Sequence, residues 1–150
     1  MNVIILRGIP GSGKSTYIRK NLPEAWIFSA DHFFMVGEEY KFDPSKLPQA
    51  HAACLREYLE WLTFVEGRRC RWPLVVDNTN TSVMEIAPYA ALALAYGASL
   101  RIVTIKCDPA VAAARNVHGV PEAAVLAMAK RLEDETPRLA PWWEHEVVQQ

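Results

Sequence analysis

The stretch GIPGSGKST, residues 8–16, constrains the fold of this chain more than any other part of its sequence. It fits the pattern G-x-x-x-x-G-K-[ST]. An apolar, β-branched run, VIIL at 3–6, precedes it and predicts a strand buried on both faces. The segment KSTYIRKNL, 14–22, predicts a helix that ends before Pro23. A strand, a glycine-rich loop and a helix in this order are the context that the pattern requires.

Strands and helices alternate along the rest of the chain. Further strands are predicted at 25–30, 74–78 and 100–107, helices at 44–66, 82–96, 109–116 and 121–133, and a short edge strand at 146–148. Asp43 before Pro44 is the predicted N-cap of the long helix. Such alternation implies parallel strands joined by right-handed crossovers, hence a three-layer α/β/α sandwich. We expect a single domain over 1–150 with a helical lid at about 109–133.

The glycine-rich loop carries the chemistry of a phosphate site. Gly8, Gly11 and Gly13 let the backbone form a concave nest whose N–H groups face phosphate oxygens. Lys14 is expected to bridge the β- and γ-phosphates of a nucleoside triphosphate, and the Ser15 hydroxyl to ligate Mg²⁺. The residues expected at the nucleotide are Gly8, Pro10, Gly11, Ser12, Gly13, Lys14, Ser15 and Thr16. The loop therefore predicts binding of ATP or GTP together with Mg²⁺.

Composition argues against several classes of function. Sixteen basic and seventeen acidic residues give a formal net charge of −1, so no overall field indicates a nucleic acid or a membrane as partner. Three cysteines without CxxC spacing disfavour a disulfide framework and a zinc site. The longest apolar run, 86–96, is too short to span a bilayer, and no export signal is evident. A cytoplasmic location is expected.

Polar side chains follow the predicted strands, and ligands of open α/β sheets bind beyond the carboxyl ends of the strands. Asp31 follows the second strand, expected beside the phosphate-loop strand, where it can orient an acceptor hydroxyl and take its proton. The alternatives are that it caps the following turn or holds Mg²⁺ through water. Asp77 ends the third strand and is expected to hold Mg²⁺ through water or to accept a hydrogen bond from Ser15. A turn formed with Asn78 is its structural alternative.

The stretch ARNVHGVP, 114–121, joins two predicted helices and carries Arg115 and His118. A cation on a movable lid can neutralise the charge that spreads over a transferring phosphoryl group, and the lid can exclude water. Arg115 is the candidate for this cation, and also for a nucleotide contact. The alternative is a solvated surface arginine.

Side chains around Asp31 form the candidate acceptor site. Its aromatic neighbours predict either the wall of a pocket or a small local core. His51, one helical turn before Leu55, is expected either to face the acceptor or to make a structural hydrogen bond. The candidates from this reasoning are His32, Phe34, Tyr40, His51, Asn78 and Asn80.

Two features lie outside this site. GRRCR, 67–71, is a local basic patch that either touches a nucleic acid backbone or forms a solvated loop, and it is expected at the sheet edge away from the phosphate loop. Trp142 and Trp143 either stack on bases or cover an edge of the core, and packing is the favoured interpretation.

Five segments in order carry a resemblance to a known family. They are GIPGSGKST, SADHFF, YKFDPSKLPQAH, VVDNTNT and RNVHGVP followed by MAKRLE, and they cover about residues 1–135. Together they resemble the phosphate-loop kinases that include the bacteriophage polynucleotide kinase domain and its eukaryotic relatives. The resemblance implies a parallel-sheet kinase that moves the γ-phosphate of a nucleoside triphosphate to a 5′-hydroxyl of DNA or RNA.

The same resemblance assigns roles to single residues. It implies the phosphate and Mg²⁺ roles for Lys14 and Ser15, and that of the acceptor-activating aspartate for Asp31. It also implies that Arg115 is a lid arginine. Arg131 corresponds to a second lid cation and is therefore added to the residues expected at the acceptor.

The chain departs from the phage pattern at Phe34, where the phage family has an arginine that contacts the acceptor's phosphate. Other acceptors therefore stay open: a hydroxymethyl group on a base in DNA, or a small hydroxylated molecule like those of the zeta-toxin type. A non-enzymatic function also stays open: a binding module in which nucleotide occupancy or hydrolysis switches a partner surface.

Overall fold

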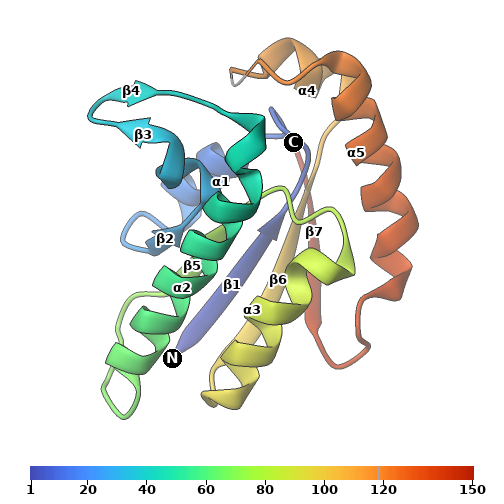
Figure 1. The fold of residues 1–150 in the computed structure, drawn as a ribbon. Coiled ribbons are helices and arrows are strands. Elements are labelled where there is room, and N and C mark those ends of the chain that lie inside the picture. The colour runs from blue at the N-terminus through green and yellow to red at the C-terminus, as the bar shows by residue number, and fades with distance from the viewer. Residues whose placement is uncertain (118) are drawn as a thin grey trace.

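A five-stranded sheet, in which every neighbouring pair of strands is parallel, forms the centre of the computed structural model, in the order β2-β5-β1-β6-β7 (Figure 1). The structure describes residues 1–117 and 119–150. The strands are β1 (Asn2–Arg7), β2 (Trp26–Phe28), β5 (Leu74–Asp77), β6 (Ser99–Lys106) and β7 (Glu144–Gln149). The α-helices are α1 (Lys14–Asn21), α2 (Leu47–Val65), α3 (Val83–Ala95), α4 (Pro109–Arg115) and α5 (Glu122–Glu135). The predicted α/β fold with a parallel sheet is confirmed.

Helices cover both faces of this sheet (Figure 1). Successive side chains of a strand point to opposite faces, and β1 follows this rule. Val3 and Ile5 lie in the core beneath α2 and α3, whereas Ile4 and Leu6 pack with Tyr17 of α1 on the other face. The result is three layers, with the sheet in the middle.

The position of β2 corrects one expectation. The second strand is expected beside β1, but in the structure β5 lies between them. Val75 and Val76 of β5 are 0% exposed, whereas Trp26 and Ile27 of β2 are 42% and 36% exposed. A central strand must be apolar toward both covering layers, and an edge strand need not be. Asp31 therefore follows an edge strand, one strand further from the phosphate loop than expected.

Local boundaries differ from the predictions around the long helix. Asp43 accepts a hydrogen bond from the Ser45 N–H (3.0 Å) and caps a 3₁₀ turn, η2 (Pro44–Lys46), so that α2 begins only at Leu47. Ahead of it, β3 (Met35–Val36) and β4 (Glu39–Tyr40) form an antiparallel hairpin that was not expected from the sequence.

The carboxyl-terminal region is more regular than predicted. β7 is six residues long and pairs with β6 along its whole length. Trp143 packs against the core beneath α2 and α3, whereas Trp142 is 75% exposed, so the packing interpretation holds for one tryptophan of the pair. Among the described residues, no helix has the length and apolar character needed to cross a bilayer.

A buried arginine ties the end of β1 to its surroundings. Arg7 is 0% exposed, and its guanidinium donates to the backbone oxygens of Asn80 (2.9 Å) and Thr81 (3.2 Å) and to Thr136 Oγ1 (3.3 Å). Burial lowers the pKa of Arg7 to about 10, while Glu135 and Glu85 oppose that shift. Arg7 therefore stays charged at neutral pH and joins β1, the loop after β5 and the turn after α5.

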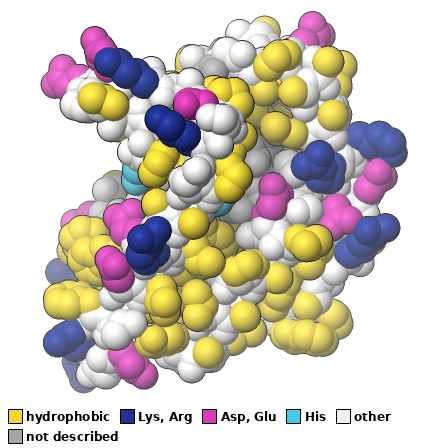
Figure 2. Space-filling view, viewed as in Figure 1, with side chains coloured by type: hydrophobic (Ala, Val, Ile, Leu, Met, Phe, Trp, Pro, Cys, Tyr) yellow, Lys and Arg dark blue, Asp and Glu magenta, His cyan; other side chains and the backbone are white. Residues whose placement is uncertain are grey.

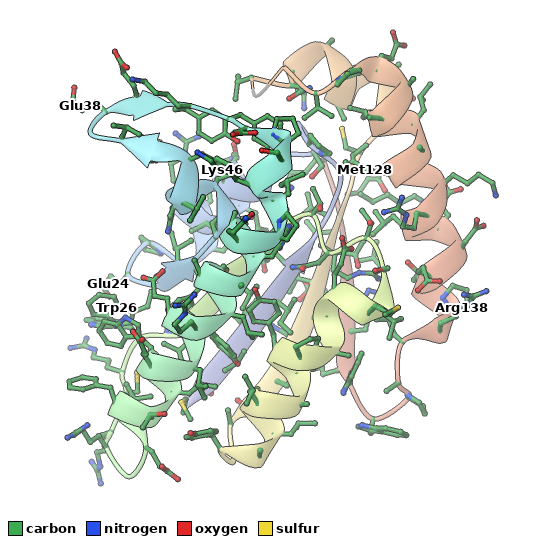
Figure 3. The ribbon with its side chains drawn as sticks, viewed as in Figure 1. Glu24, Trp26, Glu38, Lys46, Met128 and Arg138 are labelled. Carbon is green, nitrogen blue, oxygen red and sulfur yellow. The ribbon has the colours of Figure 1, made fainter. Side chains whose placement is uncertain are left out.

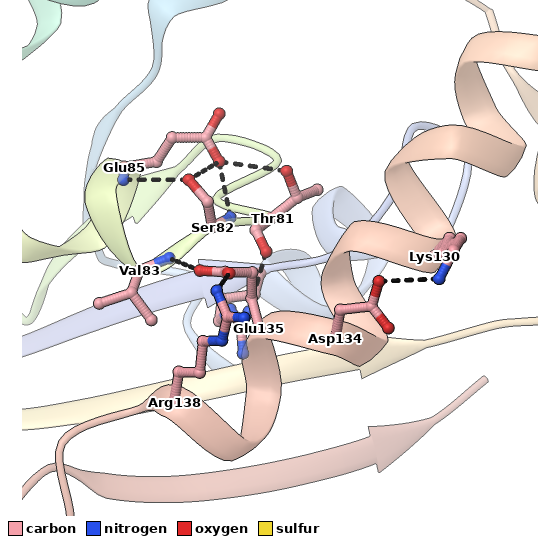
Figure 4. Close-up of polar contacts among 9 residues, drawn as sticks. Thr81, Ser82, Val83, Glu85, Lys130, Asp134, Glu135 and Arg138 are labelled. Carbon is pink, nitrogen blue, oxygen red and sulfur yellow. Dashed lines mark hydrogen bonds and ion pairs between the residues drawn. The ribbon is translucent and has the colours of Figure 1, made fainter.

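The carboxylate of Glu135 reaches from the end of α5 to the start of α3 (Figure 4). Ser82 and Glu85 form a capping box there, in which Glu85 Oε2 accepts from the Ser82 N–H (2.8 Å). Glu135 accepts from the Val83 N–H (3.1 Å) and from Arg138 (2.7 Å). This network holds α5, and with it the residues next to the phosphate loop, against the sheet.

We predict that Arg7→Met lowers the free energy of unfolding by about 3 kcal/mol, because buried acceptors lose their donor and Glu135 loses its buried countercharge. Arg101→Met on β6 is the matched control. Arg101 is partly exposed and lies 3.6 Å from Glu146, so its replacement should cost less than about 1 kcal/mol. Urea unfolding measures both, and equal losses would contradict the role given to Arg7.

Candidate active site

The glycine-rich loop runs from the end of β1 to the first turn of α1. Gly13 is the left-handed N-cap of α1 (φ 96°), and no side chain among the described residues caps this helix. The Ser12 N–H donates to Ile9 O (3.1 Å), while the buried Ser12 Oγ has no hydrogen-bond partner in the described part of the chain. The first-turn N–H groups of α1 are thus available to an anion, as a phosphate-binding loop requires.

Lys14 lies between the loop and two carboxylates. Its Nζ donates to the carbonyl oxygens of Gly8 (2.9 Å) and Ile9 (3.3 Å). Burial lowers the pKa of Lys14, and the negative charges of Asp77 and Asp31 oppose this shift. Asp77 is in register with Leu6 of β1, and Phe28 of β2 with Val76, so Lys14, Asp77 and Asp31 all lie at or after strand ends at the same edge of the sheet.

Asp31 is exposed and belongs to a 3₁₀ turn, η1 (Ala30–Phe34). The cap of this turn is Ser29, whose Oγ accepts from the Asp31 N–H (3.3 Å), so the Asp31 carboxylate is not used as the cap. Its Oδ1 accepts a hydrogen bond from the hydroxyl of Tyr40 (2.9 Å). Burial and this bond raise the pKa of Tyr40, which therefore remains a donor at neutral pH.

The aromatic residues near Asp31 form a local core, which is one of the two arrangements considered from the sequence. Phe34 is only 3% exposed and packs edge-on against Phe42 (5.1 Å between ring centroids) and Tyr40 (6.1 Å). Tyr40 and Phe42 stack with an interplanar angle of 7°. Phe34 thus supports the hairpin from beneath and does not present its ring to an acceptor, while Phe33 and Phe42 remain 42% and 46% exposed.

The two asparagines after β5 are engaged inside the protein. Asn78 Oδ1 accepts from the Ala30 N–H (2.9 Å), and its amide donates to Cys54 Sγ (3.6 Å). The Asn80 amide donates to Leu6 O (2.7 Å). Both side chains are buried, so they position the turn after β2 and the start of the phosphate loop rather than an acceptor.

The remaining acceptor candidates are exposed. His32 lies next to Asp31 on η1, and His51 lies in the first turns of α2, which packs against η1. Arg131 is exposed on α5. His32 is thus beside Asp31, and His51 lies on a helix that contacts η1. Among the described residues, Arg131 makes no hydrogen bond or ion pair to Asp31 or the phosphate loop.

Helix α4 docks directly on the phosphate loop. Gly11 has φ 78°, and a Cβ there would collide with the carbonyl oxygen of Ala112. Ile9 of the loop packs with Ala112 of α4 and Val125 of α5. Arg115 is the last residue of α4 and is exposed, while the Asn116 amide closes the following turn onto Val120 O (2.7 Å). His118 lies outside the described residues.

Comparison with known proteins identifies the family. Residues 3–134 match AAA_33, which is described as an AAA domain. The chain belongs to the AAA_33 family. It is 31% identical over 133 residues to NEDD4-binding protein 2 of Homo sapiens, in a match that covers 84% of this chain and 7% of that protein. The chain thus spans a small part of this relative's length.

Solved kinases share the fold of this AAA_33 chain. A gluconokinase from Sinorhizobium meliloti matches with a TM-score of 0.62 and 18% identity, over 99% of this chain and 82% of that one. The APS kinase CysC of Mycobacterium tuberculosis, in complex with AMPPNP and APS, matches with a TM-score of 0.57 and 18% identity, over 99% and 87%. Identities this low establish a common fold, that of the phosphate-loop kinases.

The AAA_33 site has a donor set that fits Mg²⁺. Ser15 is exposed in the first turn of α1, and the half-buried Asp77 lies close enough to affect the charge of Lys14. The described residues hold no group of three His, Cys, Asp or Glu side chains that would form an all-protein metal site. A hydroxyl and a carboxylate at a phosphate loop suit Mg²⁺, which keeps several waters and takes further oxygens from phosphates.

Sequence reasoning missed two supporting residues of the AAA_33 site. Arg7 follows the apolar run at 3–6, and the neighbouring residues in the sequence give no sign that its guanidinium is buried. Ser29 caps the turn that carries Asp31, and the pattern S-A-D before an aromatic pair was the available signal. The capping box at Ser82 and Glu85 was likewise readable as S-x-x-E.

We predict that Gly11→Ala lowers the free energy of unfolding by more than about 2 kcal/mol, because a Cβ adds backbone strain and must also displace α4 from the loop. Gly37→Ala is the matched control. Gly37 has φ 64° but open space around its Cβ position, so only the strain, about 1 kcal/mol, should remain. Thermal and urea unfolding compare the two variants, and equal effects would mean that α4 does not press on Gly11.

Proposed function

We propose that this chain is a phosphotransferase that moves the γ-phosphate of ATP to a hydroxyl of a nucleic acid or nucleotide, above all a polynucleotide 5′-hydroxyl. The observation that carries the proposal is the placement of Lys14, Asp77 and Asp31 at the same end of the sheet, beside an uncapped helix N-terminus. A nucleotide-gated binding module needs the loop and Asp77 but gives no reason for an exposed, oriented carboxylate at Asp31. The AMPPNP bound to the APS kinase supports ATP over GTP as donor.

In this proposal each residue has a separate task. The loop N–H groups and Lys14 hold the phosphates, and Lys14 exchanges its bonds to Gly8 O and Ile9 O for phosphate oxygens. Ser15 and, through water, Asp77 would hold Mg²⁺, which would supply positive charge to the phosphates when bound. Arg115 approaches the phosphates from the end of α4 and adds positive charge as the transfer proceeds.

Asp31 acts on the acceptor. Tyr40 occupies Oδ1 of the carboxylate, which leaves Oδ2 to accept the hydrogen bond of an acceptor hydroxyl. The hydroxyl oxygen bonds to the γ-phosphorus, the bond from phosphorus to the β–γ bridging oxygen breaks, and the hydroxyl proton passes to Asp31. The nucleoside diphosphate leaves with the electron pair of the broken bond.

A small hydroxylated acceptor is the second candidate. Gluconokinase and APS kinase share the fold, and the buried Phe34 supplies no cation for an acceptor phosphate. A hydroxymethyl group on a DNA base is a further alternative. Labelled γ-phosphate offered with oligonucleotides, hydroxymethylated DNA and sugars distinguishes them, and label found only as free phosphate would contradict the kinase proposal.

We predict that Asp31→Asn lowers kcat by at least about 100-fold, because asparagine still accepts the Tyr40 hydrogen bond but cannot take the proton. Nucleotide affinity and unfolding temperature should change little. Glu38→Gln, an exposed carboxylate at the hairpin tip in Figure 3, is the control and should keep the native rate. An Asp31→Asn variant with more than about a tenth of native kcat would end the assignment of Asp31 as base.

We predict that Arg115→Ala lowers kcat by about 10³ while the KM for the nucleotide changes little, because a lid cation acts on charge that develops in the transition state. Arg56→Ala, an exposed arginine on α2, should leave both constants unchanged. Steady-state phosphotransfer measures both variants. A loss of less than about threefold would make Arg115 an ordinary surface residue.

A further inference from the structure

A row of aromatic side chains lies at the amino end of β2 and the carboxyl end of α2, at the opposite end of the sheet from the phosphate loop. It consists of Trp72, Trp26, Trp61 and Phe64, and we refer to it as the β2-edge row. The rings of Trp26 and Trp61 are 4.1 Å apart between centroids, and those of Trp61 and Phe64 are 5.4 Å apart. Trp26 is 42% and Phe64 58% exposed, so open ring surface remains.

Two shallow hollows, both wide open to solvent, lie along this row, and Figure 2 shows hydrophobic side chains at the surface where Figure 3 labels Trp26. One, of about 310 Å³, is lined by Glu24, Ala25, Trp26 and Trp72, and the other, of about 380 Å³, by Glu60, Trp61 and Phe64. Contact between Trp26 and Trp61 makes the hollows neighbours. Glu24 and Trp26 are seen at the rim of the molecule in Figure 3, well away from the hairpin tip at Glu38. Each hollow thus combines an aromatic wall with one carboxylate.

Arginines border the row. The Arg68 guanidinium lies 4.6 Å from the ring centroid of Phe64, and that of Arg71 lies 4.7 Å from that of Trp72. Arg69 is exposed between them. Within the described residues these three arginines take part in no ion pair. A guanidinium stacked on a ring is held in place and keeps its N–H donors for a phosphate.

We propose that the β2-edge row binds single-stranded nucleic acid, with one base in each hollow and the intervening phosphates at Arg68, Arg69 and Arg71. A base offers a flat π-face to the aromatic wall and, in cytosine, an exocyclic amino group that donates to a carboxylate such as Glu24 or Glu60. An apolar peptide would leave Glu24 and Glu60 without a hydrogen-bond donor. In a bound single strand, the bases can donate to these carboxylates in the hollows, and the phosphates can accept from the arginines at the border of the row. The hollows suit single strands because duplex bases are not free to stack on protein rings.

This surface is distinct from the proposed active site. The row begins at the amino end of β2, whereas Asp31 follows its carboxyl end, so a strand bound here does not need to present a 5′-hydroxyl. The proposal therefore does not rest on phosphotransfer, and it gives a place to the GRRCR segment that the active site leaves unused. If the acceptor is a polynucleotide, the row would hold the strand at a distance from the reacting end.

The test is direct binding of a circular single-stranded oligodeoxycytidine to the full chain, measured by anisotropy and by quenching of tryptophan fluorescence. A circle has no 5′-hydroxyl, so binding is independent of the acceptor site. Arg68→Ala with Arg71→Ala should weaken binding at least about fivefold and reduce the slope of log affinity against log salt by about 1.4. Phe64→Ala, at an exposed helix position, should weaken it by about tenfold.

Matched controls and a base comparison sharpen the test. Trp142→Ala and Arg138→Ala remove an exposed tryptophan and an exposed arginine outside the row and should leave affinity unchanged. Oligodeoxycytidine should bind more tightly than oligodeoxythymidine, whose base lacks an amino group, and Glu24→Gln with Glu60→Gln should reduce that difference. Absence of binding, equal loss in the control variants, or binding of an arginine-rich peptide in place of the oligonucleotide would overturn the proposal.

Discussion

The buried guanidinium of Arg7 is the interaction on which the rest of the structure depends. A charged group without exposed surface must have its donors satisfied, and Arg7 finds acceptors in the loop after β5 and in the turn after α5. The next residue, Gly8, begins the phosphate loop and donates to Thr79 O (3.0 Å). The charge that fixes the end of β1 therefore also fixes the loop that follows it. One buried ion therefore links the turn after α5, the loop after β5 and the start of the phosphate loop.

Electrostatics at the site follow a similar logic. Lys14 loses water by burial, which lowers its pKa, and the two carboxylates beside it favour the charged form. These carboxylates come from strands that are neighbours in the sheet but lie far apart in the sequence. Tyr40, on a hairpin with its own small aromatic core, sets the direction of Asp31. The proposed base thus depends on packing around Phe34, which explains why an aromatic residue stands at that position.

The two surfaces of the molecule differ in what they offer a ligand. The carboxyl ends of the strands present N–H donors, a lysine and carboxylates, a set suited to phosphate and to a hydroxyl. The amino end of β2 presents open rings with carboxylates between arginines, a set suited to bases. Because β2 is an edge strand, Trp26 and Ile27 stay partly exposed, and this exposure makes the tryptophan available to a ligand. The edge position of β2 therefore accounts for the exposed tryptophan on this surface.

The sequence by itself determined the strand–loop–helix unit at 1–22, the alternation of strands and helices, and the residues of the phosphate loop, because these depend on local periodicity and on glycine spacing. It also placed Asp77 at the end of its strand, Arg115 near the end of its helix and Asp31 after the second strand. Only the tertiary structure decided that β5 separates β2 from β1, that Phe34, Asn78 and Asn80 are buried, and that Arg7 is a buried charge. These outcomes depend on which apolar surfaces compete for the centre of the sheet and on partners more than seventy residues away, such as Asn80 for Arg7. No local pattern records that competition.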